Sequence, residues 1–255
     1  MALLAFLALG AYAAYEVLEA PGNQLFGGTL VAGASATREV ALTFDDGPNP
    51  PYTNRILDVL RREHVRATFF LVGRAVAAYP QTVRRIVADG NAVGNHTWDH
   101  AHLIVESPRE VRSELQRTSD AIARASGVRP VLMRPPFGAR DPAVLAEARR
   151  MGYRVVMWSV PLPNDWEQPG DATIARRVID KVEPGSIIVL HDGNRGLVCA
   201  RGHRSPGTAC DRGQDVAATR EIVETLRARG FRFVTIPQLI VDSDRDTRLM
   251  RTASR

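Results

Sequence analysis

Two adjacent carboxylates, Asp45 and Asp46, follow the apolar run at residues 40–42 and stand directly before Gly47 and Pro48. The run is typical of a buried strand, so the acids are expected at its carboxyl end, on the rim of a sheet. Two like charges in a poorly solvated place raise each other's pKa, and a cation or a catalytic role would explain them. A solvated turn is the alternative, because Asp-Gly is a common turn signal.

A second pair of residues that could do chemistry is His96 and His100, spaced four apart. On a helical turn this spacing would put both imidazoles on one face, within reach of one cation. Together with one carboxylate from the acidic pair they would make three ligands, which is typical of a catalytic metal site with open positions. Zinc is the expected ion, and cobalt or iron would also suit these ligands. The other aspartate could then accept a proton from the attacking water.

Further polar and aromatic residues follow other predicted strands. His191 could face the base and donate a proton to a leaving group, or it could simply bond to a loop carbonyl. Arg134 could pair with a carboxylate and hold it ionised, or lie in solvent. Phe137, Trp166 and Leu190 could form the walls of an apolar pocket, or belong to the core.

The elements that must position these residues alternate along the chain. Short apolar runs predict strands at residues 40–44, 67–72, 92–94, 131–134, 155–158, 187–190 and 231–236. Amphipathic stretches predict helices at residues 54–62, 80–89, 108–126, 142–151, 172–181 and 216–229. About seven such repeats predict a parallel sheet with crossover helices, either open and doubly wound or closed into a barrel. In both architectures the carboxyl ends of the strands gather the chemistry.

The composition indicates one globular domain. The chain has 255 residues, 45% of them hydrophobic, and a formal net charge of +5. Nearly all of the basic residues are arginines scattered along helical stretches, which favours solvated helix faces over attraction to an acidic polymer. Because no basic patch is interleaved with aromatic residues, nucleic-acid binding is not predicted. We expect a monomer.

The two ends of the chain differ from the expected domain at residues 38–241. Residues 1–20 form an apolar segment that suits a signal remnant, a membrane anchor or a buried helix, and residues 242–255 form a polar tail expected to be frayed. Cys199 and Cys210 lie in one glycine-rich loop and could close it by a disulfide. These features favour an extracytoplasmic protein, either membrane-anchored or secreted.

Five segments in order resemble the motifs of the polysaccharide deacetylases, the NodB-homology group or carbohydrate esterase family four. They are Thr43-Phe44-Asp45-Asp46-Gly47-Pro48, His96-Thr97-Trp98-Asp99-His100, Arg134-Pro135-Pro136-Phe137-Gly138, Asp165-Trp166 and Ile188-Val189-Leu190-His191. Each segment is a weak signal alone, but five in order are specific. The resemblance covers nearly the whole chain and implies a single-domain α/β fold, a distorted (β/α) barrel with about seven parallel strands.

The resemblance also implies a role for each matching residue. Asp45 would be the general base and His191 the general acid, while Asp46, His96 and His100 would hold a divalent metal. Arg134 would orient the base and Asp165 would orient or tune the acid. The substrate would contact residues on two segments of the fold and one tryptophan, namely Pro136, Phe137, Gly138, Leu190 and Trp166. The implied reaction is the hydrolysis of N-acetyl groups on peptidoglycan or a chitin-like glycan, with release of acetate.

Two departures from the family pattern concern the substrate wall. A further aspartate that is common shortly before the Asp-Trp pair is missing between Trp158 and Asp165. Phe137 stands where a tyrosine is frequent, so one hydroxyl that could contact sugar is absent. The alternatives are an O-deacetylase of acetylated xylan and a non-catalytic glycan-binding module on the same fold. A glycoside hydrolase fits less well, since its two acids would flank a sugar ring and not be adjacent in sequence.

Overall fold

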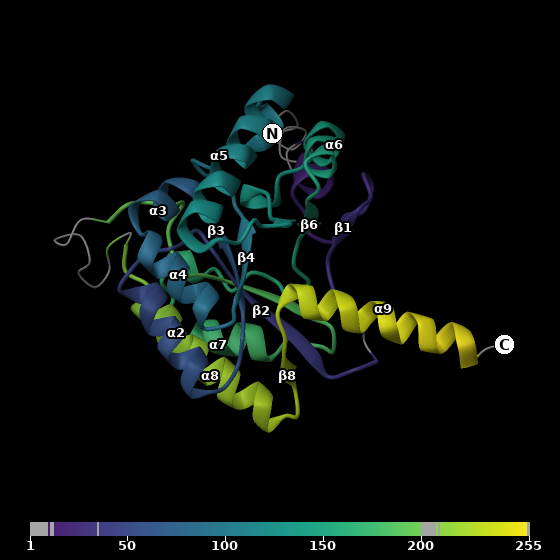
Figure 1. Cartoon of the computed structure of the whole chain (residues 1–255). Helices are drawn as coiled ribbons and strands as arrows, with labels where there is room; N and C mark the ends of the chain where they lie inside the picture. Colours follow the sequence, from purple (N-terminus) through teal and green to yellow (C-terminus); the bar gives the residue numbers. More distant parts are fainter. Residues whose placement is uncertain (1–9, 11–12, 35, 200–207, 209, 254–255) are drawn as a thin grey trace, which may run out of the picture.

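The computed structural model describes residues 10, 13–34, 36–199, 208 and 210–253. At its centre lies a curved sheet in which all paired strands are parallel (Figure 1). Seven strands follow one path in the order β1-β6-β5-β4-β3-β2-β7, and β8 pairs separately with β2. The strands are β1 Thr29–Leu30, β2 Glu39–Asp45, β3 Thr68–Leu71, β4 Ala92–Asn95, β5 Leu132–Met133, β6 Arg154–Val156, β7 Ile187–His191 and β8 Arg232–Phe233.

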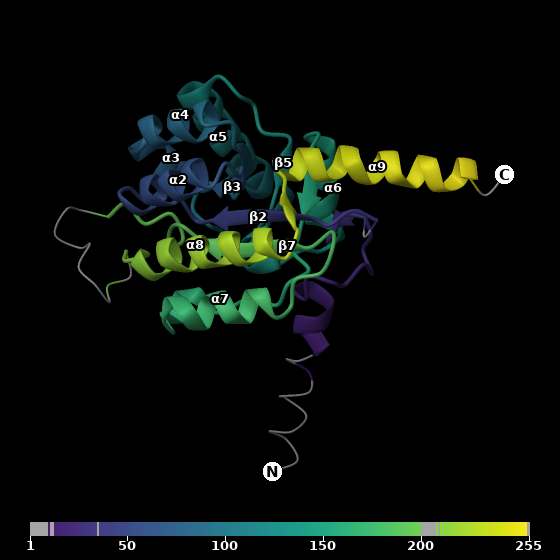
Figure 2. The same cartoon turned by 90° about the horizontal axis from the view of Figure 1, so that it is seen from below.

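Helices surround this sheet, as the prediction of a single-domain distorted barrel requires. They are α2 Tyr52–Arg62, α3 Gly73–Ala78, α4 Pro80–Ala88, α5 Pro108–Ser126, α6 Pro142–Arg150, α7 Asp171–Ile179, α8 Gly213–Ala228 and α9 Ile236–Ala253. Three short 3₁₀ turns complete the chain path, at η1 Leu103–Val105, η2 Pro136–Gly138 and η3 Asp165–Glu167. In Figure 2, α2 to α5 lie on one side of β2, and α7 and α8 lie on the other.

Alternation along β2 sends its side chains to two different cores. Val40, Leu42 and Phe44 pack under the outer helices, whereas Ala41 belongs to the cluster inside the curved sheet. Because successive strand residues point to opposite faces, Asp45 lies on the same face as Ala41, at the carboxyl end of the strand. The parity of the strand therefore decides which residues reach the site.

Sequence signals at the helix ends predicted the bounds of several helices correctly. Helix α5 begins with a capping box in which the Ser107 hydroxyl accepts from the Glu110 amide and the Glu110 carboxylate accepts from the Ser107 amide. Helix α6 begins where the Asp141 side chain accepts from the amide of Val144, 2.8 Å away. Helix α5 ends at Gly127, whose φ of 76° lies in the left-handed region that favours glycine.

Other predictions about the elements were wrong. Strand β1 and helix α3 were not foreseen, because two and six residues are too few for a recognisable periodicity. The polar tail is not frayed within the described residues, since α9 runs through it to Ala253 and projects from the body in Figure 1. Its start is fixed by buried Ile236 and Leu239, and the Ser243 hydroxyl accepts a hydrogen bond from the Ala34 amide.

The N-terminal segment is described only in part. Residues 13–18 are helical, and residues 1–9, 11 and 12 lie outside the described residues, so the predicted apolar segment at 1–20 is only partly visible. Among the described helices, none combines the length and the hydropathy needed to cross a membrane.

Candidate active site

The three candidate metal ligands, Asp46, His96 and His100, converge beyond the ends of β2 and β4. The Nε2 atoms of His96 and His100 lie 3.4 and 3.1 Å from Oδ1 of Asp46. All three side chains are at least 93% shielded from solvent, yet Asp46 Oδ1 meets no donor in hydrogen-bonding geometry. A buried carboxylate oxygen without a donor and two imidazole nitrogens that face it make a suitable ligand set for a divalent cation.

The two histidines are brought together by an irregular loop, so the expectation of a helical turn was wrong. Strand β4 ends at Asn95, and both Thr97 and His100 have left-handed φ values of 65° and 59°. The Asn95 side chain accepts from the Thr97 amide at 2.9 Å, which stabilises this local turn. Left-handed residues at two positions of a short loop are strained, and such strain is concentrated at functional sites.

Helix α5 supports the same loop from behind. One carboxylate oxygen of Glu114 accepts from the amides of Trp98 and Asp99, at 2.8 and 3.0 Å. The Nδ1–H of His96 donates to the carbonyl of Arg134 at 2.8 Å, because a carbonyl can only accept. The Nε2 of His96 therefore carries the lone pair that faces Asp46, which is the tautomer that a metal ligand needs.

Asp45 is held by a different partner. The Nη1 of Arg134 donates to Asp45 Oδ1 at 2.7 Å, and both side chains are buried. The same guanidinium donates to the Thr43 hydroxyl at 2.8 Å and to the carbonyls of Val156 and Met157 at 3.2 and 3.0 Å. All three nitrogens of this buried guanidinium donate hydrogen bonds, so Arg134 is fixed in place and holds the Asp45 carboxylate in position.

His191 is paired with Asp165, as the resemblance implied. Its Nδ1 lies 2.9 and 3.0 Å from the two carboxylate oxygens, and its backbone amide donates to Asp165 Oδ2 at 2.7 Å. Burial lowers the pKa of His191, but the charge of Asp165 outweighs it and raises the pKa to about 9. With Nδ1 engaged, Nε2 is the ring nitrogen left for a substrate. The Trp166 ring packs edge-on against His191, with ring centroids 5.5 Å apart.

The electrostatics of the metal ligands also favour a cation. Burial raises the pKa of the Asp46 carboxyl, but the neighbouring His100 and His96 imidazoles hold that pKa well below its usual range. Burial also lowers the pKa of His100, although Asp46 opposes this shift. An ionised carboxylate beside an imidazole biased toward its neutral form is the protonation pattern that metal ligands require.

These groups line one cavity of about 710 Å³. Of the predicted site residues, it contains Asp45, Asp46, His96, His100, His191, Phe137, Gly138 and Trp166. Arg134 and Asp165 do not line the cavity themselves, but each forms an ion pair with a residue that does.

Two of the residues predicted to contact substrate do not line this cavity. Leu190 is fully buried in the outer core, and Val189 lines the cavity in its place, because β7 residues alternate between the two faces. Similarly, Pro135 lines the cavity and Pro136 does not. The sequence could have given the correct residue of β7 by counting two positions back from His191.

Sequence reasoning missed Glu19, which lies in the segment predicted to be an anchor or a signal remnant. Glu19 lines the cavity and its Oε1 lies 3.3 Å from Nε2 of His102. The segment is fixed by buried Arg140, whose guanidinium donates to the carbonyls of Ala20 and Asn23 at 2.8 and 2.6 Å. No motif in the sequence links Arg140 to residues that lie about 120 positions earlier.

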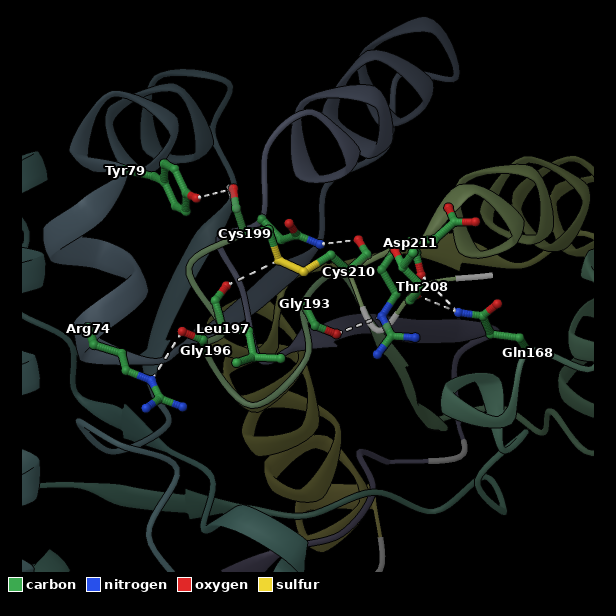
Figure 3. Close-up of a disulfide and its surroundings, with 12 residues drawn as sticks. Arg74, Tyr79, Gln168, Gly193, Gly196, Leu197, Cys199, Thr208, Cys210 and Asp211 are labelled. Atoms are coloured by element: carbon green, nitrogen blue, oxygen red, sulfur yellow. Dashed lines mark hydrogen bonds between the residues drawn. A yellow bond between two sulfur atoms is a disulfide. The ribbon is translucent and has the colours of Figure 1, made fainter. Parts of the chain in front are cut away.

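Asn194, Arg195 and Leu197 form a further wall of the cavity, just before a loop closed by a disulfide. Cys199 and Cys210 are bonded and buried, with their Cα atoms 6.1 Å apart (Figure 3), which decides the pairing that the sequence left open. The Arg195 amide, shortly before this loop, donates to Asp46 Oδ2 at 2.7 Å, and the Arg195 guanidinium lies over the Phe137 ring at 5.3 Å. Residues 200–207 and 209 lie outside the described residues.

Comparisons with known proteins agree with this geometry. The sequence profile described as polysaccharide deacetylase matches residues 32–156. A chitooligosaccharide deacetylase of Bradyrhizobium sp. (strain ANU 289) is 42% identical over 206 residues, which cover 80% of this chain and 92% of that protein.

Solved structures show the same fold. A peptidoglycan N-acetylglucosamine deacetylase aligns with a TM-score of 0.74 and 33% identity, covering 84% of this chain and 92% of that one. A CE4 family pseudoenzyme from Bacillus anthracis aligns with a TM-score of 0.72 and 27% identity, covering 82% and 67%. Likeness of fold therefore extends to a protein without activity, and the site residues must carry the functional argument.

Proposed function

Because this chain belongs to the polysaccharide deacetylase family, we propose that it is a metal-dependent hydrolase that removes N-acetyl groups from an N-acetylglucosamine-containing glycan. One observation carries the proposal. A carboxylate ion-paired with Arg134 and an imidazole held protonated by Asp165 line the same cavity as the Asp46, His96 and His100 cluster. A base, an acid and a cation site in one cavity are the parts that amide hydrolysis needs.

Asp46, His96 and His100 would hold the cation, with zinc as the preferred ion and cobalt as an alternative. When bound, a divalent cation supplies Lewis-acid polarisation of the amide carbonyl and lowers the pKa of water. Its charge also allows two adjacent carboxylates, Asp45 and Asp46, to stay ionised together.

The chain's own residues handle the protons. Asp45 accepts a proton from water as the water oxygen forms a bond to the amide carbon, and Arg134 holds Asp45 in position for this step. His191 donates its Nε2 proton to the amide nitrogen as the carbon–nitrogen bond breaks, and Asp165 fixes the required tautomer through Nδ1–H. Acetate and the free amine of the sugar are the products.

The cavity suits an N-acetyl group on a sugar. Trp158, Trp166 and Val189 supply an apolar wall beside the proposed base and acid, and half-exposed Phe137 offers a ring face for a sugar. The relatives named above act on chitooligosaccharide and on peptidoglycan, so both glycans are candidate substrates for this chain.

We also propose an extracytoplasmic location, either secreted or tethered through the N-terminal segment. The Cys199–Cys210 disulfide supports this, because disulfides persist in oxidising compartments.

The experiment is acetate release from N-acetylglucosamine oligomers, peptidoglycan and acetylated xylan, before and after chelation and with zinc or cobalt restored. We expect release from an N-acetylated glycan that chelation abolishes and zinc restores. Release from xylan alone would replace the proposal by O-deacetylation. Glycan binding without acetate release under any of these conditions would make the chain a binding module.

A further inference from the structure

A second buried carboxyl group lies behind the His191–Asp165 pair and has no part in the reaction described above. Asp215 stands in the first turn of α8, and its side chain is fully buried in hydrogen-bonding contact with Asp165. Neither of its carboxyl oxygens receives a hydrogen bond from an N–H or O–H donor in the described part of the chain. A buried ionised carboxylate without donors is costly, so the neutral acid is the form that this place favours.

The surrounding segments hold Asp215 against Asp165. The side-chain amide of Gln214 donates to the backbone carbonyl of Asp165 at 2.9 Å. The oxygen of the same side chain accepts from the backbone amide of Gly170 at 2.9 Å. The Gln168 amide donates to the carbonyls of Thr208 and Asp211 at 3.0 and 3.5 Å, and Figure 3 shows these three residues side by side. These hydrogen bonds tie the segment at residues 165–170 to the start of α8 and the residues just before it.

The charged groups facing this pair show which acid carries the proton. Both oxygens of Asp165 accept hydrogen bonds from His191, and Arg212 attracts both carboxyl groups. Burial raises the pKa of Asp165, but the positive charge of His191 holds it below the usual range. Burial and the nearby charge of Asp165 raise the pKa of Asp215 well above the usual range. The negative charge therefore lies on Asp165 and the proton on Asp215.

We propose that Asp215 is a positioning residue that stays protonated in the working enzyme and donates its carboxyl proton in a hydrogen bond to Asp165. The bond draws negative charge away from the oxygens that face His191. A general acid must release its proton to the substrate, and a fully charged Asp165 would hold the His191 proton too firmly. Asp45 and Asp46 are the other carboxylates that face His191, and both also raise its pKa. This inference rests on His191 acting as the acid of the proposed function.

The test is a titration of His191 by NMR in the zinc-loaded, full-length protein labelled with ¹⁵N-histidine. It compares wild type with Asp215→Asn, Asp215→Ala and Thr219→Val. The Asn variant keeps a neutral donor, so the pKa of His191 stays within about 0.3 units of wild type. The Ala variant removes the donor, so that pKa rises by about one unit, and the alkaline limb of kcat/KM rises with it. Thr219→Val changes the next turn of α8 without touching Asp165, so it controls for loss of helix stability.

Two results would overturn the proposal. A fall in the pKa of His191 in Asp215→Asn would show that wild-type Asp215 is ionised, because the substitution would then remove a negative charge. A carboxyl-carbon resonance of Asp215 typical of a carboxylate at pH 7 would show the same. Both readouts work if the Ala variant fails to fold. Neither NMR measurement needs turnover. If the protein released no acetate, the proposed function would be refuted, and the two measurements would still test the protonation of Asp215.

Discussion

Asp45 and His191 are register partners at the ends of the neighbouring parallel strands β2 and β7. Each has a partner of opposite charge behind it, Arg134 for the carboxylate and Asp165 for the imidazole. The proposed base and the proposed acid are therefore neighbours that differ in the charge of the partner behind them. The sheet register brings the two groups together, and the partners set their roles.

The first prediction separates the base from the metal ligands. Asp45→Asn removes the proton acceptor but not Asp46, His96 or His100, so we expect kcat to fall about 10²–10⁴-fold while zinc affinity is kept. Zinc content by mass spectrometry and acetate release measure the two properties. His96→Ala is the contrasting variant and should lose both. Full activity in Asp45→Asn would remove Asp45 from the mechanism.

The second prediction concerns Glu114, which the sequence motifs do not include. Glu114→Ala frees the amides of Trp98 and Asp99, so the loop that carries the two histidines loosens, and zinc affinity falls by about 10–100-fold. Glu114→Gln retains an acceptor oxygen and should bind zinc much as wild type does. Calorimetric titration with zinc measures these affinities.

A matched control lies on the same helix. Glu110→Ala removes the carboxylate half of the capping box and weakens the start of α5, but it leaves the Glu114 contacts in place. If Glu110→Ala weakened zinc binding as much as Glu114→Ala, helix stability and not the carboxylate contact would be responsible.

The third prediction is a pH dependence. His191 acts in its protonated form, so activity persists below its pKa and is lost as the pH rises through it. That pKa is raised from 6.5 to about 9 by carboxylates that include Asp46, and a cation at Asp46 would offset part of the shift. The alkaline limb of kcat/KM should therefore lie between these values.

Asp165→Asn removes the charge that raises the pKa of His191 most, so the alkaline limb should move to lower pH and kcat should fall. A pH profile of kcat/KM over pH 5–10 measures the shift. An unchanged limb in this variant would mean that another group supplies the proton.

The fourth prediction tests the N-terminal segment as part of the site. Arg140→Ala removes the guanidinium that binds Ala20 and Asn23, and the lost charged hydrogen bonds should cost about 2–3 kcal/mol. We expect faster limited proteolysis near residue 20 and a higher KM, since Glu19 is no longer held at the cavity. Arg149→Ala is the control, because exposed Arg149 makes only a 3.5 Å contact with Phe26 of the same region. Equal protease sensitivity in the two variants would contradict the role of Arg140.

The sequence by itself determined the alternation of strands and helices and the main parts of the site. Parallel strands bury both faces, so they appear as apolar runs, and the polar residues after each run mark the active edge. Asp45, Asp46, His96, His100 and His191 could all be identified in this way, because each follows such a run directly or within a short loop.

Only the tertiary structure decided which neighbouring residue faces the cavity and which distant residues support it. Val189 replaced Leu190 because strand pairing, and not the motif, sets the parity of β7. Glu19, Glu114 and Asp215 come from segments without a motif, and contacts across the fold bring them to the site. Such contacts leave no local pattern, because the periodicity of a segment records which face is buried and not what covers it.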